Sequence, residues 1–172
     1  MKPKLFLSLL CLIALFISCK KENFENKKDL EKSYQQWLNF KTTSGNSYQY
    51  TVGGGSWTGI GWQTVITVND GKVAKRDFKY ILPADWNGNI PDDKKQWTEN
   101  ENEINSHTNT VAAEAITLDG IYEKARTYWL KKRSNAKTYF EAKNNGLISW
   151  CGYIEDGCQD DCFNGITIIH IE

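Results

Sequence analysis

The chain has 172 residues, and its 21 basic and 21 acidic side chains give a formal net charge of zero. This length fits one domain, which can bury roughly two-thirds of the surface of its unfolded chain. The balance of charge argues against a nucleic-acid-binding protein, because such proteins carry a strongly basic face.

The first residues have the pattern of a secretory signal peptide. Lys2 and Lys4 precede an uncharged stretch, residues 5–18, which ends in the small residue Ser18, and this order is typical of a cleaved signal. A membrane-spanning helix needs about 20 apolar residues. The stretch is shorter, so we expect it to direct export without remaining as a membrane span.

Residues 16–19 read Phe-Ile-Ser-Cys and resemble the bacterial lipobox. The resemblance implies that residues 1–18 are removed and that Cys19 becomes the first residue, carrying acyl chains such as palmitate. Two or three chains hold a protein durably, since each buried methylene contributes about 0.8 kcal/mol. We therefore expect a lipoprotein of the bacterial cell envelope, anchored at the outer membrane and facing the periplasm or the exterior. An ordinary cleaved signal with an incidental cysteine is the alternative.

Residues 20–28, KKENFENKK, are almost wholly polar. Such a segment buries too little apolar area to offset the entropy lost on ordering. We therefore expect the lipidated cysteine and a flexible tether over residues 19–28, and a single globular domain over residues 29–172. The charged run also resembles the surface-export signal of Bacteroidetes-type lipoproteins, although it lacks the usual acid pair, and a plain solvated linker is the alternative.

A helix and a strand open the predicted domain. Gly45 ends the helix, and a half-buried strand follows in which Tyr48, Tyr50 and Val52 alternate with polar residues. The next run, GGGSWTGIG, fits neither the dinucleotide fingerprint nor the P-loop, so it predicts a turn. The apolar stripe of the helix is Leu30, Tyr34, Trp37 and Leu38.

The clearest hairpin lies over residues 61–82. A three-residue connection, residues 69–71, predicts that Thr64 faces Arg76 and that Trp62 faces Phe78. A one-residue slip would move the apolar residues to both faces. The predicted register instead gathers on one side Ile60, Trp62, Ile66, Phe78 and Tyr80.

This register leaves Arg76 among apolar neighbours. An inward-facing arginine requires a carboxylate partner, because an isolated buried charge is very unfavourable. Glu99, Glu101 and Glu103 recur at every second position, and each could supply the carboxylate if that segment is a neighbouring strand; we take Glu101 as the candidate partner. We expect a structural ion pair between Arg76 and Glu101, with an active-site pair as the alternative.

The segment 82–116 is rich in turn residues, and an unstructured loop of that length is uncommon in a compact domain. We therefore predict a strand over residues 97–104 and a binding surface in the remainder. Thr117 then caps a second helix, with Asp119 in its first turn and basic residues 131–133 at its far end. The apolar stripe of that helix is Leu118, Ile121, Tyr122, Ala125 and Trp129.

Residues 138–142 and 147–154 predict a further hairpin, and residues 165–171 are rich in β-branched residues on both faces, as in a central strand. The chain thus reads helix, several strands, helix and three strands. This order predicts the α+β class, with a mostly antiparallel sheet of about six to seven strands and two helices packed on one face.

Three cysteines lie close together near the end of the chain. Cys151, Cys158 and Cys162 cannot all pair within one chain, and in an oxidising compartment we expect one disulfide among them. Pairing of Cys162 with either Cys151 or Cys158 is possible. The alternatives are three free thiols and a cysteine-rich metal site completed by His170 or Asp160, but the spacings fit neither a paired C-x2-C zinc site nor an EF-hand. We therefore assign no metal and no cofactor.

Aromatic residues make up 13% of the chain. Trp57, Trp86 and Trp97 lie in glycine-rich or acidic loops, where flat exposed rings suit sugars or protein partners. They are candidate ligand-binding residues, and packing at the edge of the core is the alternative. The tryptophans expected in the core are Trp37, Trp62, Trp129 and Trp150.

Catalytic signatures are lacking. The histidines, His107 and His170, lie in no metalloprotease helix, and no G-x-S-x-G motif occurs. A nucleophilic pair of Cys158 and His170 requires the thiol to escape oxidation. The sequence therefore indicates a protein that is not an enzyme.

A Trp-bearing first helix is followed by YQYTV, VITVNDGKVAKR, TLDGIYEKA and the closing DDCFNGITIIHI. This succession resembles a family of uncharacterised bacterial secreted and lipoprotein domains, over most of residues 30–172. That family has no established activity, so the resemblance implies no catalytic residue. We expect a lipid-anchored, non-catalytic binding module for an unknown protein or glycan. The alternatives are a metal- or thiol-dependent activity at the cysteines and a purely structural or inhibitory role.

Overall fold

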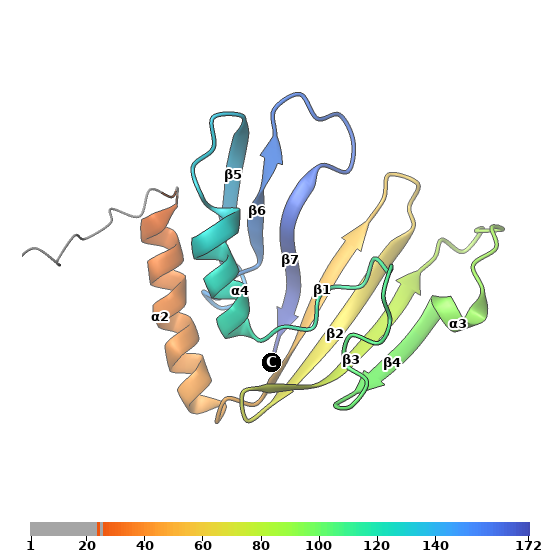
Figure 1. Ribbon diagram of the computed structural model, residues 1–172, viewed down its shortest axis with the longest axis horizontal. Coiled ribbons are helices and arrows are strands. Elements are labelled where there is room, and N and C mark those ends of the chain that lie inside the picture. The colour runs from red at the N-terminus through yellow and green to blue at the C-terminus, as the bar shows by residue number, and fades with distance from the viewer. Residues whose placement is uncertain (1–23, 25) are drawn as a thin grey trace, which may run out of the picture.

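The computed structural model describes residue 24 and residues 26–172. The expected signal peptide and Cys19 lie outside the described residues. Among the described residues, no helix is long and apolar enough to cross a membrane. In chain order the elements are α2 (Lys27–Thr43), β1 (Tyr48–Gly55), β2 (Gly61–Asn69), β3 (Lys72–Ile81), α3 (Asp92–Lys95), β4 (Gln96–Asn100), α4 (Leu118–Lys124), the π-helix η2 (Ala125–Trp129), β5 (Ala136–Glu141), β6 (Trp150–Glu155) and β7 (Phe163–Ile171) (Figure 1).

The strands form one seven-stranded sheet in the order β4-β3-β2-β1-β7-β6-β5. Every neighbouring pair is antiparallel, which confirms the α+β class and the antiparallel sheet. The first strand pairs with the last, and β7 lies between β1 and β6, as predicted for a central strand.

The sheet is split where β1 meets β7. The ladder between them runs from Tyr50 with Ile171 to Val52 with Ile168, with Ile169 as a bulge, and Gln49 next to it exchanges two backbone hydrogen bonds with Glu172. Beyond this point β1 stays paired with β2 and β7 stays paired with β6. The two strands therefore diverge toward one end of the sheet, as Figure 1 shows.

The β2–β3 hairpin corrects the predicted register. Its turn has two residues, Asp70 and Gly71, with left-handed φ angles of 48° and 76°, as a type I′ turn requires. A bulge follows, and beyond it Thr64 pairs with Phe78 instead of with Arg76. The bulge adds one residue and restores the side-chain parity, so Phe78 and Arg76 are buried on the predicted face.

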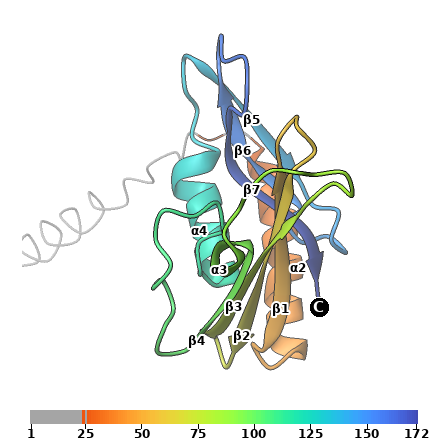
Figure 2. The same ribbon diagram turned by 90° about the vertical axis from the view of Figure 1, so that its right-hand side faces the viewer.

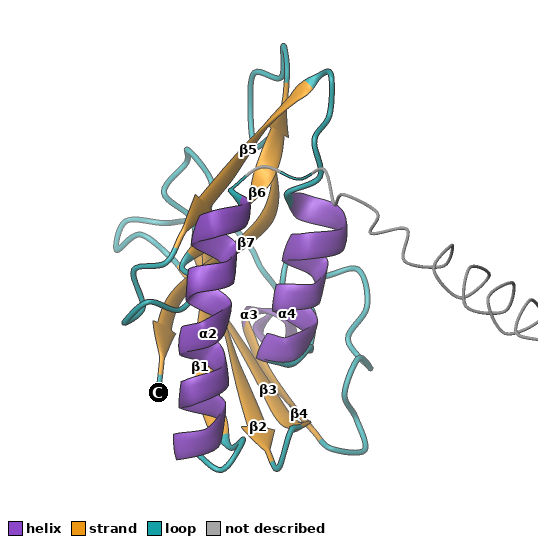
Figure 3. Ribbon diagram, turned by 90° about the vertical axis from the view of Figure 1, so that its left-hand side faces the viewer, coloured by secondary structure: helices purple, strands orange, loops and turns teal. Residues whose placement is uncertain are grey.

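The core joins both longer helices to the sheet. Trp37 of α2 is fully buried, and its indole N–H donates to Asp119 of α4 over 2.9 Å. The Tyr122 hydroxyl of α4 lies 2.7 Å from Ser33 Oγ of α2, and the two helices run side by side in Figure 3. Leu38 was predicted on the buried stripe but is 36% exposed, because it lies at the margin of that face.

The start of α4 is as predicted. The Thr117 side chain accepts a hydrogen bond from the Gly120 backbone N–H over 3.3 Å, and the predicted apolar stripe is buried. The helix continues as the π-helix η2, which ends at Trp129. Short π-helical turns are rare and frequently occur at functional sites.

Candidate functional site: a cleft at the split in the sheet

A cleft of about 1120 Å³ opens where β1 and β7 part. Residues 53–55 of β1 line one side, and Phe163, Gly165 and Thr167 of β7 line the other. Its volume lies slightly above the range of about 300–1,000 Å³ that is usual for small-molecule pockets. The cleft is thus large enough for a ligand of several residues.

The lining comes from both faces of the sheet. Val52 and Ile166 point into the core, whereas Thr167 and Ile169 lie on the opposite face. The cleft therefore passes through the gap between the strands. The aromatic residues that line it are Trp62, Tyr80, Trp129, Trp150 and Phe163.

The aromatic rings are held in place by glycines. A β-carbon at Gly54 would lie 2.4 Å from the Trp62 ring, so the indole lies directly against the Gly54 backbone. The Phe163 ring packs in the same way over Gly152 and stacks on Trp150 with ring centroids 5.1 Å apart. These positions require glycine because any side chain would displace the ring.

The glycine run was predicted as a turn, and this prediction is wrong in part. Residues 53–55 complete β1, and only residues 56–60 form the connection to β2. The strand continues through the glycines because each of them pairs with β2.

The segment between β4 and α4 forms a further wall of the cleft. It runs beside β2 and β3 in Figures 1 and 2, and its residues Ala113, Glu114 and Ile116 line the cleft. The Ala113 backbone N–H donates to Thr64 Oγ1 over 2.9 Å. The Tyr50 hydroxyl donates to the Ile116 carbonyl, so two strands position this wall.

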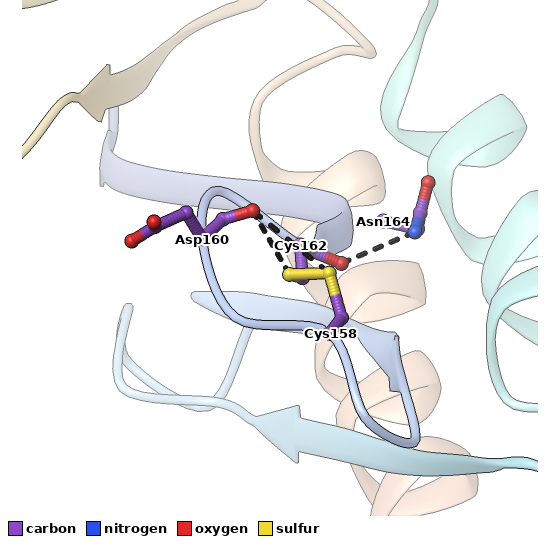
Figure 4. The surroundings of a disulfide bond; sticks show 4 residues. All are labelled: Cys158, Asp160, Cys162 and Asn164. Atoms are coloured by element: carbon purple, nitrogen blue, oxygen red, sulfur yellow. Dashed lines mark hydrogen bonds between the residues drawn. A yellow bond between two sulfur atoms is a disulfide. The ribbon is translucent and has the colours of Figure 1, made fainter.

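A disulfide borders the cleft. Cys158 and Cys162 are joined, with their Cα atoms 6.0 Å apart, and Cys162 lines the cleft. The Asn164 amide donates to the Cys162 carbonyl over 3.2 Å and steadies the loop (Figure 4). The expectation of one disulfide is confirmed, and of the two possible partners Cys162 pairs with Cys158 and not with Cys151.

The third cysteine of the group, Cys151, is a buried free thiol. Burial raises the pKa of its thiol to about 12, so it is a poor nucleophile in the folded protein. At pH 8 we expect iodoacetamide to leave Cys151 unmodified in the folded protein and to modify it once the chain is unfolded without a reductant. Mass spectrometry of the peptide that contains Cys151 measures this uptake. Labelling of the folded protein would mean that this core opens readily.

The predicted ligand-binding tryptophans do not line the cleft. Trp57 is 84% exposed at the tip of the β1–β2 connection, and Trp86 packs against Gly88 in its own loop. Trp97 lies between Phe78 and His107, with ring centroids 5.1 and 4.1 Å away. Trp97 therefore has a packing role, and the cleft uses tryptophans that were assigned to the core.

Arg76 is buried, as predicted, but its partner is Glu99 and not Glu101. The Arg76 Nη1 atom lies 3.2 Å from Glu99 Oε2, while Glu101 is exposed. Glu99 is the residue that pairs with Arg76 in the β3–β4 register, and its strand ends at Asn100 before Glu101 is reached.

The ion pair fastens the cleft wall to the sheet. Arg76 donates from Nε to the Ala113 carbonyl over 2.9 Å. Glu99 accepts hydrogen bonds from the backbone N–H groups of Asn105 and His107, over 2.8 and 2.7 Å. Burial alone would raise the pKa of Glu99, but these backbone bonds and the Arg76 guanidinium hold the pKa below its usual value.

This lowered pKa predicts a pH dependence of stability. The Glu99 carboxylate stabilises the fold fully above its unfolded pKa of about 4.3, and this contribution is lost as the pH falls through the lower folded pKa. We expect Glu99→Gln to be less stable than the parent protein at pH 7, with a difference that shrinks below about pH 4.3. Urea unfolding at several pH values measures this. A difference independent of pH would contradict the assignment.

Sequence reasoning missed the cleft because the cleft is formed by the pairing of β1 with β7, which are far apart in the sequence.

Among the described residues, no group of three or more His, Cys, Asp and Glu side chains is placed to hold a metal ion. No protein-family model matches the chain, and comparisons with curated proteins and with solved structures give no significant match. The geometry of the cleft therefore carries the functional conclusion.

Proposed function

We propose that this chain is a lipoprotein of the bacterial cell envelope, anchored through Cys19, whose domain binds a protein or glycan ligand in the cleft without catalysing a reaction. The observation that carries the proposal is the row of aromatic rings on both sides of the split between β1 and β7. Concave apolar sites with a few polar groups are the usual place for ligands.

The proposed location in the cell envelope rests on the first residues of the chain. The charged start, the uncharged stretch and the Phe-Ile-Ser-Cys segment all fit a lipoprotein signal. Residues 20–28 would link the anchor to the domain. The proposal further takes α2 and α4 to cover one face of the sheet, which is consistent with the alternate burial of Tyr48, Tyr50 and Val52 in β1.

Binding tests the proposal directly. The processed protein is screened on a glycan array and against a displayed peptide library, and Trp62→Ala and Trp150→Ala are compared with Trp57→Ala. Stacking and burial of an aromatic ring contribute about 1–3 kcal/mol, so we expect each cleft variant to weaken binding at least about fivefold and Trp57→Ala to have little effect. Calorimetry measures the affinities, and urea unfolding checks that the variants fold.

The opposite pattern would overturn the cleft as the site. If Trp57→Ala weakened binding and the cleft variants did not, the exposed loop would be the binding surface. The alternative function, a metal- or thiol-dependent activity, has no specific observation in its favour. Cys151 is buried, and Cys158 is joined to Cys162.

A further inference from the structure

One backbone edge of β1 is unpaired within the cleft. Residues 53–55 pair with residues 61–63 of β2 on one side. On the other side, the pairing with β7 stops at Val52. No strand in residues 26–172 pairs with this second side of residues 53–55, so their outward backbone groups are left for solvent or for a ligand.

The direction of these backbone groups follows from the paired part of the strand. Gln49 exchanges both backbone hydrogen bonds with Glu172, over 2.8 and 2.9 Å. Because backbone direction alternates along a strand, the N–H and C=O groups of Gly53 and Gly55 point to the same side as those of Gln49. They therefore point into the cleft and away from β2.

The edge of β7 that faces β1 also has backbone groups that point into the cleft. The Ile168 backbone N–H donates to the Ser149 carbonyl over 2.8 Å, and residues 163–167 pair with β6 on that side. By the same alternation, the backbone groups of Phe163, Gly165 and Thr167 face β1. Both walls of the gap thus present rows of donors and acceptors, as exposed edge strands do.

We propose that an extended segment of a partner protein enters this gap and adds a strand along residues 53–55 of β1. The inference rests on the proposed function and specifies its ligand as a polypeptide. An extended chain supplies backbone donors and acceptors with the spacing of a neighbouring strand, which lies about 4.7–4.9 Å away. A glycan has no such regular series of groups.

The side chains around the gap suit a guest strand. Residues 53–55 have no side chains of their own, so the alternate side chains of the guest meet Trp62 on one face and the stacked Trp150 and Phe163 on the other. Aromatic and β-branched residues pair well across strands. The guest is therefore expected to carry apolar or β-branched residues at its centre.

The charge at the rim favours a neutral or basic segment. Among the described residues that line the cleft, the charged ones are Glu114 and Asp161, both acidic. Glu114 is already bonded to Lys124, so Asp161 is the carboxylate left for a basic side chain of the guest. Opposite charges improve association and the choice of partner.

Backbone methylation of a bound peptide tests strand addition without altering the protein. A random heptapeptide library is selected against the processed protein, and the best peptide is synthesised with N-methyl groups at alternate positions, first the odd and then the even ones. Because alternate N–H groups of a strand point to opposite sides, we expect at least one of the two series to lose binding by tenfold or more. Loss in both series would mean that β7 pairs with the guest as well.

A matched pair of protein variants tests the edge of β1. Gly55→Pro removes the N–H that points into the cleft and leaves the pairing with β2, and proline is tolerated at such an edge. Gly55→Ala keeps the N–H, and its β-carbon would lie at ordinary contact distance, with the nearest atom 3.4 Å away. We expect Gly55→Pro to weaken peptide binding at least tenfold and Gly55→Ala to weaken it less than threefold.

The outcomes separate this inference from the proposed function. If both methylated series bound as tightly as the unmethylated peptide, strand addition would be overturned and the binding cleft would remain in place. If a glycan bound but no peptide did, and Trp62→Ala weakened glycan binding, strand addition would again be wrong and the binding cleft would again remain in place. If neither a peptide nor a glycan bound, both proposals would be wrong.

Discussion

Replacing Arg76 with methionine is expected to lower the free energy of unfolding by about 3–5 kcal/mol, because it leaves a buried carboxylate without its partner. Arg76 is 4% exposed and the Glu99 side chain is fully buried. The change also removes the hydrogen bond from Arg76 Nε to the Ala113 carbonyl. Urea unfolding at pH 7 measures the loss.

Two further variants identify the origin of that loss. In Arg76→Met with Glu99→Leu the buried charge is gone, so we expect part of the stability to return, although the backbone N–H groups of Asn105 and His107 lose their acceptor. Glu101→Gln, at an exposed neighbouring position, is expected to change stability by less than about 0.5 kcal/mol. A loss under about 1 kcal/mol for Arg76→Met would show that the ion pair is not needed to hold this region together.

The same substitution connects stability to the proposed site. Ala113 lines the cleft, and the Arg76 side chain holds its carbonyl against the sheet. Loosening of this wall would weaken ligand binding even where the domain remains folded. A combined loss of stability and affinity is therefore expected for Arg76→Met but not for Glu101→Gln.

Local patterns predicted most elements of this fold, although not α3 or the π-helix η2, and long-range pairing decided the site. Alternation identified Tyr48, Tyr50 and Val52 as buried residues of one strand, and Thr117 marked the start of α4 as capping chemistry requires. These features depend on neighbours in the sequence. The pairing of β1 with β7 joins residues more than a hundred positions apart, and no local pattern reports it.

The register of the first hairpin shows how a wrong pairing can still predict the right face. The structure combines a two-residue turn with a bulge, and together they shift the pairing by an even number of residues. The buried face is therefore the predicted one, whereas the partner of each residue is not. The ion pair of Arg76 is a similar case, because the expected segment supplies the carboxylate but β4 ends at Asn100, so that Glu99 and not Glu101 lies opposite Arg76.

One sequence signal pointed to the cleft and was interpreted as a turn. Residues 53–55 are consecutive glycines in a strand, where glycine is unfavourable unless another group approaches the backbone closely. The Trp62 ring is the group that does so at Gly54. An aromatic residue on the neighbouring strand, opposite a glycine, would therefore have indicated a ring lying on the backbone instead of one packed wholly in the core.

Truncation of Trp37 to alanine is expected to lower the free energy of unfolding by about 3–5 kcal/mol, since it removes a fully buried indole and leaves a cavity. The ring packs against Tyr48 and Tyr122, with centroids 5.2 and 6.4 Å away, and so joins α2 to both β1 and α4. Trp37→Phe retains a ring and loses the hydrogen bond to Asp119, so its expected loss is smaller.

Leu38→Ala is the matched control for this position, because Leu38 follows Trp37 in the same helix but is partly exposed. We expect it to lose less than about 1 kcal/mol, as surface substitutions usually do. Urea unfolding followed by far-ultraviolet circular dichroism measures all three variants under the same conditions. If Leu38→Ala were as damaging as Trp37→Ala, α2 would have to bury a different face from the one described, and the core that supports the cleft would be arranged differently.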